Sequence, residues 1–153
     1  MDVWGLAAIA AKWALYVGVL GAAGTVLCAL LFRVTGTRGV AGCFAALGLA
    51  AGGLSFMLKG VALTGDASGL TDPEMLGLLW GTRSGTALAL QAGGLATLLI
   101  GLALGSVGRL VAALVGLVAL GSFAALGLVA DRVRLVLSGV LLLHLSGLAV
   151  WIG

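Results

Sequence analysis

Charged residues divide the chain into five long runs that carry no charge. Each run has at least 19 residues, and together they cover residues 13–32, 39–58, 84–108, 110–130 and 135–153. A helix rises about 1.5 Å per residue, so about 20 apolar residues cross the hydrocarbon core of a bilayer. The pattern predicts an all-α integral membrane protein whose five transmembrane helices form an up-down bundle. The expected helices cover about residues 6–32, 39–60, 84–105, 109–130 and 134–153, within a single transmembrane domain of residues 1–153.

Composition supports a membrane protein and excludes several other classes. Apolar residues make up 62% of the chain and charged residues 8%, whereas about a quarter of a soluble domain is charged. Two cysteines among 153 residues cannot build a disulfide scaffold. The net charge of +3 is not gathered into a basic stripe, so no nucleic-acid partner is expected. The chain begins Met1-Asp2 without a basic segment, and its first basic residue, Lys12, falls inside the apolar stretch. A signal peptide has its basic residues first, so none is expected, and we expect the first helix to be retained.

Residues 59–83 form the one long connection between predicted helices. Within it, Thr71 or Asp72 can cap a helix, Pro73 suits its first position, and Glu74 suits its first turn. Apolar residues follow up to Trp80. The pattern predicts a short helix at about residues 72–80 that lies in the membrane interface.

The distribution of charge favours an N-terminus outside the cell membrane, although the arginine count is balanced. In this orientation all five carboxylates lie outside, whereas the turn at residues 33–38 and Arg109 lie in the cytoplasm without any acid. Orientation follows lysine and arginine rather than net charge. Arg83, Arg132 and Arg134 would then lie outside, which gives three arginines on each side.

Glycines recur at spacings that place them on one face of a helix. The pattern comprises Gly18, Gly21 and Gly24 in the first helix and the pairs Gly48/Gly52, Gly81/Gly85 and Gly101/Gly105. Small residues let helix backbones approach closely in lipid. The pattern therefore predicts tight packing within the bundle, and a pore lining or a homodimer seam is the alternative.

Two lysines lie near the predicted outer surface. Lys12 precedes the middle of the first helix, and Lys59 lies near the end of the second. Both side chains are long enough to snorkel to the interface, which makes interfacial anchoring one interpretation. The other interpretation pairs them with Asp66, Asp72 or Glu74 at the rim of an outward-facing site.

His144 is the most informative single residue, because ionisable groups at membrane depth are costly. It follows Arg134 by ten residues, which places it about 15 Å into the bilayer. Gln91 follows Arg83 by eight residues and reaches about 12 Å from the same side, so the two side chains could meet. His144 is either a buried histidine bonded to a polar neighbour or a metal ligand. A single histidine cannot provide both axial ligands of a haem, so no haem is expected from this chain alone.

Met57 and Met75 flank the acidic segment and carry thioether sulfurs, which are soft ligands that suit Cu(I). Packing against apolar neighbours is the alternative role for both methionines. The sequence contains no Ser-His-Asp order, phosphate loop, zinc spacing or catalytic carboxylate pair that can be placed. We therefore expect that the protein is not an enzyme.

Three stretches resemble the copper resistance protein D (CopD) family of bacterial inner-membrane proteins. They are residues 2–24 (DVWGLAAIAAKWALYVGVLGAAG), residues 54–91 (with FMLKGVALTGD and GLTDPEMLGLLWGTRSGTALALQ) and the closing LLLHLSGLAVWIG. Family members are longer, and the resemblance covers their N-terminal part. It implies a role in copper uptake or tolerance, beside a periplasmic copper-binding partner of the CopC type.

The resemblance also carries over individual residues. His144 and Trp151 match the family's helix motif, and its outer charged positions are matched by Lys12, Lys59, Asp66, Asp72 and Arg83. Relatives often have a Gly-His pair where this chain has Gly127-Leu128, so a ligand at that position is absent.

These observations predict a protein of copper transport or homeostasis in the bacterial inner membrane. Copper would enter near Met57 and Met75 and pass to His144. The alternative is a non-transporting membrane subunit or scaffold, whose helices pack against a partner chain or a second copy of this one.

Overall fold

The computed structural model describes residues 3–104 and, beyond them, only residues 108, 111, 114–116, 147 and 151. Residues 3–104 form four α-helices and one 3-10 helix. In chain order these are α1 (Val3–Leu31), α2 (Arg38–Thr64), η1 (Ala67–Leu70), α3 (Pro73–Trp80) and α4 (Arg83–Ala103). Three of them, α1, α2 and α4, are long and apolar enough to cross a membrane.

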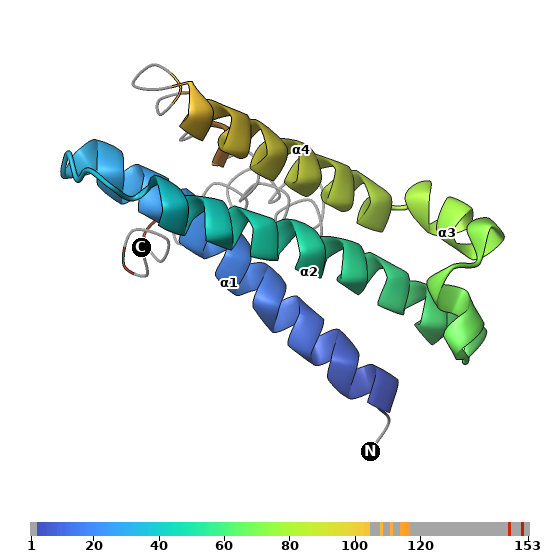
Figure 1. The fold of residues 1–153 in the computed structure, drawn as a ribbon. Helices are drawn as coiled ribbons and strands as arrows, with labels where there is room; N and C mark the ends of the chain where they lie inside the picture. The colour runs from blue at the N-terminus through green and yellow to red at the C-terminus, as the bar shows by residue number, and fades with distance from the viewer. Residues whose placement is uncertain are drawn as a thin grey trace, which may run out of the picture.

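The long helices lie lengthwise against one another, with α2 beside both α1 and α4 (Figure 1). α2 runs opposite to its two neighbours, so the chain goes up, down and up again (Figure 1). The short elements η1 and α3 form the corner between α2 and α4, and we call this side of the bundle the α3 end. Residues 32–37 form the turn at the opposite side, which we call the turn end.

The elements within residues 3–104 are all helices, as predicted for a membrane protein, and they include three of the five predicted spans. The helices expected at about residues 6–32, 39–60 and 84–105 correspond to α1, α2 and α4. The spans expected at residues 109–130 and 134–153 lie outside the described residues, apart from isolated positions. α2 continues past its expected end, because its stop signal is Gly65 in the left-handed conformation (φ 82°) rather than the charge of Lys59.

Glycine brings α1 and α2 into backbone contact. A Cβ atom on Gly18 would collide with the backbone of Gly48, and one on Gly21 would lie 2.7 Å from the ring of Phe44. Leu95 of α4 reaches the same point, because its Cδ1 would lie 2.9 Å from a Cβ on Gly48. The three helices therefore meet at positions where glycine has no side chain to separate them, as the glycine pattern predicts for a closely packed bundle.

The core lies between the three long helices. Its largest fully buried side chains come from all of them: Val19, Val26, Val61, Leu95 and Leu98. In contrast, the outward faces carry exposed aromatic residues such as Trp13 and Trp80, which are 68% and 57% exposed. An apolar exterior around an apolar core is expected of a protein whose solvent is lipid.

Two aspartates organise the corner at the α3 end. Asp66 caps η1, with its Oδ1 accepting from the Ser68 N–H at 2.7 Å and also from the Ser68 hydroxyl. Asp72 caps α3, with its Oδ1 accepting from the N–H groups of Glu74 at 2.9 Å and Met75 at 3.4 Å. Of the two expected capping residues, Asp72 is therefore the cap, and Pro73 follows it as predicted.

The 3-10 helix η1 is not foreseen by the sequence pattern. It packs against α2 through glycine, because a Cβ on Gly60 would collide with the carbonyl oxygen of Gly69. Gly85 has a similar role at the other side of the corner, where a Cβ would collide with the carbonyl of Trp80. The Gly81/Gly85 pair therefore serves a tight corner rather than a helix–helix seam.

We expect the substitution Asp72→Ala to loosen α3 without unfolding the bundle. Loss of an aspartate N-cap costs about 1 kcal/mol, because two backbone N–H groups lose their acceptor. Hydrogen exchange should show faster exchange of the amides of Glu74 and Met75, and unchanged exchange in the centre of α2. Glu74→Ala is the matched control, since Glu74 is an exposed acid of the same turn with no capping bond. Equal effects of the two substitutions would contradict the capping role.

Candidate functional site

Polar side chains form one short stripe on each long helix. The partners in each stripe are four or seven residues apart, a spacing that places them on one helix face. The stripes are Lys12 and Tyr16 on α1, Ser55 and Lys59 on α2, and Ser84 and Gln91 on α4. Each stripe lies in the half of its helix that is nearer the α3 end.

Two adjoining cavities connect the three stripes. One cavity, of about 330 Å³, lies between α1 and α2, and its wall includes Lys12, Tyr16, Ser55 and Lys59. The other, of about 40 Å³, reaches α4, and its wall includes Ser55, Lys59, Ser84 and Gln91. Ser55 and Lys59 line both cavities. We call the two cavities together, with the six polar residues in their walls, the polar cleft.

Lys59 is held in place by a serine rather than by a carboxylate. Its Nζ donates a hydrogen bond of 2.8 Å to Oγ of Ser84, which links α2 to the start of α4. Within residues 3–104, neither Lys59 nor Lys12 forms an ion pair with an acid. The polar cleft therefore contains two positive charges that no described residue neutralises.

Two further polar groups of the cleft are buried without a hydrogen bond to any described residue. They are Oγ of Ser55 and Nε2 of Gln91, whose side chain is only 6% exposed. An unsatisfied buried donor costs about 1–3 kcal/mol, so such a group normally has a partner. The partner of the Gln91 amide is therefore expected to enter through the cavity that Gln91 lines.

The carboxylates at the α3 end have other roles than binding the lysines. Asp66 and Asp72 accept hydrogen bonds from backbone N–H groups, and Glu74 is exposed. The hydroxyl of Ser68, together with its N–H, holds the pKa of the Asp66 carboxyl below its usual range. Asp66 is consequently charged at neutral pH, but its charge is directed to η1 and not to Lys12 or Lys59.

The other predicted site residues lie away from the polar cleft or outside the described residues. Met57 is 42% exposed on α2, and Met75 is half-buried in α3. Arg83 is exposed at the start of α4. His144 falls outside the described residues, so its meeting with Gln91 stays a prediction. Among the described residues, no group of three histidine, cysteine, aspartate or glutamate side chains could hold a metal ion.

Ser55, Ser84 and Tyr16 are the members of the cleft that sequence reasoning did not find. Helical spacing could have identified two of them, because Ser55 precedes Lys59 by four residues and Tyr16 follows Lys12 by four. Ser84 precedes Gln91 by seven residues, which places the two on one helix face, but this spacing does not indicate contact with Lys59. It meets Lys59 only because the corner at residues 65–82 brings the start of α4 next to the end of α2.

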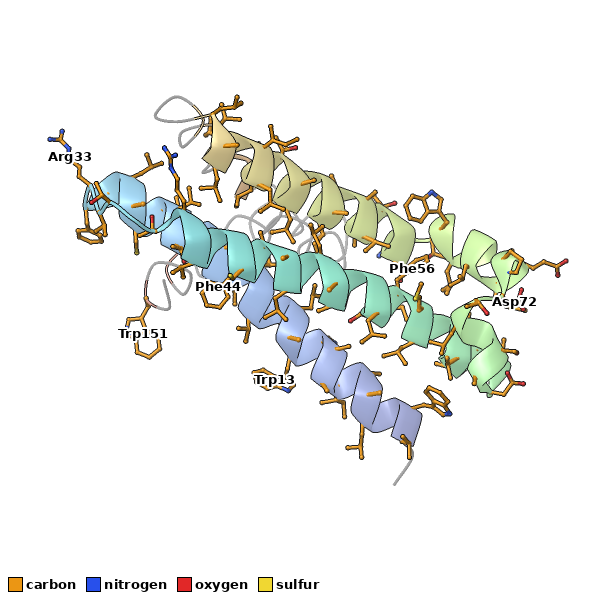
Figure 2. All side chains as sticks on the ribbon, viewed as in Figure 1. Trp13, Arg33, Phe44, Phe56, Asp72 and Trp151 are labelled. Carbon is orange, nitrogen blue, oxygen red and sulfur yellow. The ribbon has the colours of Figure 1, made fainter. Side chains whose placement is uncertain are left out.

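The distribution of charge along the bundle separates its two ends. Figure 2 shows Arg33 beside the turn end and Asp72 at the opposite extreme, beside α3. The turn end carries Arg33 and Arg38 without an acid, whereas residues 59–83 contain Asp66, Asp72 and Glu74 as well as cations. The polar cleft therefore opens near the end that holds the carboxylates.

Comparison with known proteins identifies the family. The family model for the copper resistance protein D-like N-terminal domain matches residues 1–132, which is most of the chain. The matched region contains all six residues of the polar cleft and ends before His144. No curated protein and no solved structure matched the chain. The chain therefore belongs to the copper resistance protein D-like family, through that family's N-terminal domain.

Proposed function

We propose that this protein takes part in copper homeostasis by carrying copper ions across the inner membrane of a bacterium. The observation that carries the proposal is the family match over residues 1–132. The N-terminus and the α3 end would face the periplasm, and the turn end with Arg33 and Arg38 would face the cytoplasm. This orientation keeps the acid-free basic turn on the side where positive loops are favoured.

The α3 end is the proposed entrance for copper. Met75 lies in the first turn of α3, directly after the exposed Glu74, and Met57 lies two residues before Lys59 on the exposed surface of α2. Thioether sulfur is a soft ligand that suits Cu(I), and a carboxylate raises the local concentration of cations. From there copper would pass to His144, which the spacing from Arg134 places near the middle of the bilayer.

The polar cleft is not the proposed path of the copper ion. Two ammonium groups that line one cavity repel a metal cation. In contrast, α3 carries Glu74 and Met75 without any lysine or arginine. Met57 has a single lysine nearby in the sequence, Lys59. We therefore separate a copper route along α3 from the cleft between α1, α2 and α4.

The proposal includes partners at the periplasmic side. A copper-binding protein of the CopC type would deliver the ion to the α3 end, and no catalysis is proposed. A second copy of the chain or another helical chain would cover part of the apolar exterior.

Replacing both methionines tests the proposed entrance. In cells that express the full chain, Met57→Leu with Met75→Leu should lower copper accumulation toward the level of cells carrying an empty vector. Leucine keeps the size and apolar character of methionine while removing the sulfur ligand. Leu54→Met is the matched control, because it adds a thioether to an exposed position of α2 without touching either methionine.

Accumulation by the double variant equal to that of the wild type would contradict the methionine entrance. If cells expressing the wild type accumulate no more copper than the empty vector, the transport proposal fails. The chain would then act as a membrane scaffold, and copurification with a partner chain would be expected instead.

A further inference from the structure

The polar cleft is built from groups that donate hydrogen bonds. Lys12 and Lys59 contribute ammonium groups, which can only donate. The Ser84 hydroxyl already accepts from Lys59 Nζ, so its own proton remains available for another acceptor. The unsatisfied Gln91 Nε2 and the Ser55 hydroxyl add two more donors at the buried wall. A ligand of this cleft must therefore supply acceptors.

The charge of the cleft favours an anion. Lys12 and Lys59 line the same cavity, and no acid among residues 3–104 pairs with either of them. Lys12 and Lys59 are both exposed, but their like charges at one cavity still repel each other, and a negative charge between them would remove this repulsion. An anion at the junction of the two cavities, where Ser55 and Lys59 line both, would remove this repulsion and would also lie on the side of the Gln91 amide.

The size and position of the cleft fit a phosphate group. The larger cavity has a volume of about 330 Å³, several times the roughly 30 Å³ that one water molecule occupies in the liquid. Lys59 lies five residues before the end of α2, about 8 Å along the helix, and Ser84 lies in the first turn of α4. Both therefore lie close to the level at which lipid head groups meet the hydrocarbon core.

We propose that the polar cleft binds a phosphate group, supplied either by the head group of an anionic lipid or by free inorganic phosphate. The ammonium groups of Lys12 and Lys59 contact its oxygens from two sides, as lysine does in other phosphate sites. Ser55, Ser84 and Gln91 complete the coordination from α2 and α4. The bound anion holds α1, α2 and α4 together at the α3 end, away from the contact of α1 with α2 at Gly18 and Gly48.

The purified full chain, reconstituted in nanodiscs, tests the proposal with two probes. Inorganic phosphate is titrated by isothermal calorimetry in nanodiscs of phosphatidylcholine, and the enrichment of phosphatidylglycerol is measured in mixed nanodiscs by mass spectrometry. Lys59→Gln should lower the affinity for the probe by at least about tenfold, because a charge-assisted hydrogen bond and a positive charge are lost. Arg83→Gln is the matched control, since it removes one positive charge at the same end without lining the cleft.

Gln91→Leu is the second variant and separates binding from folding. It replaces the unsatisfied amide by an apolar group of similar size, so the ligand-free protein should be at least as stable as the wild type, while the affinity for the probe falls. Phosphate binding that Lys59→Gln and Gln91→Leu weaken supports free phosphate as the ligand. If the wild type enriches phosphatidylglycerol in mixed nanodiscs and the same two variants do not, the ligand is a lipid head group. Absence of both signals in the wild type, or an equal loss in Arg83→Gln, overturns the proposal.

Discussion

Replacing Gly18 with leucine is expected to separate α1 from α2 and to unfold this part of the bundle. A Cβ on Gly18 would already collide with the backbone of Gly48, and backbone atoms cannot turn aside as a side chain can. The helices would have to move apart, which would also withdraw Leu95 from its position against Gly48. Overpacking of this kind costs about 3 kcal/mol or more. The free energy of unfolding, measured by titration of the purified protein with denaturing detergent, should fall by that amount.

Gly53→Leu is the matched control for this substitution. Gly53 also lies in α2, but no described atom lies within 4 Å of a Cβ built at this position. Substitution there meets open space, so the free energy of unfolding should not fall, and the higher helix propensity of leucine should raise it by up to about 1 kcal/mol. If Gly18→Leu were as well tolerated as Gly53→Leu, the proposed close contact of α1 with α2 would be wrong.

The described helix boundaries could be read from the sequence because local chemistry sets them. Asp72 and Pro73 start α3 through a side-chain cap and a fixed φ angle, which act over three residues. The end of α2 was less accessible, since a single lysine in an apolar helix does not stop it. Its stop depends on Gly65, one of 27 glycines in the chain, and the left-handed conformation that Gly65 adopts cannot be read from the sequence.

The role of each glycine could be predicted only in part. Spacing indicated that Gly48 and Gly52 share a face, but only Gly48 is in tight contact, whereas a Cβ on Gly52 would find ordinary contacts at 3.5 Å. The partner of Gly48 depends on the depth at which α1 and α2 cross, which is a tertiary property. The same limit applies to Gly60 and Gly69, whose contact requires η1.

Some residues of the candidate site can be recognised in the sequence, whereas others belong to it only because of the tertiary structure. Lys12, Lys59 and Gln91 stand out in apolar runs, because charged and amide groups are rare there. Asp66 also stands out, but its neighbour Ser68 directs its carboxylate to η1, so acidic residues close in sequence do not form one site. Ser84 becomes a member of the cleft only through the corner that brings α4 beside α2.

The substitution with the largest expected effect on function is His144→Ala. In the sequence His144 is the only histidine and lies in the middle of an uncharged run. The proposed copper route has no other nitrogen ligand at that depth, so loss of the imidazole should reduce copper movement to the background rate. Ser146→Ala is the matched control, because it removes a polar group two positions away and keeps the imidazole.

Uptake of radioactive Cu(I) into liposomes that contain the purified full chain tests the central proposal most directly. We expect the wild type and Ser146→Ala to accumulate copper above protein-free liposomes, and His144→Ala to match the protein-free level. Circular dichroism of each sample checks that the helices are intact. Accumulation by His144→Ala equal to that of the wild type would contradict the copper route, and a wild type equal to protein-free liposomes would contradict copper transport by this chain.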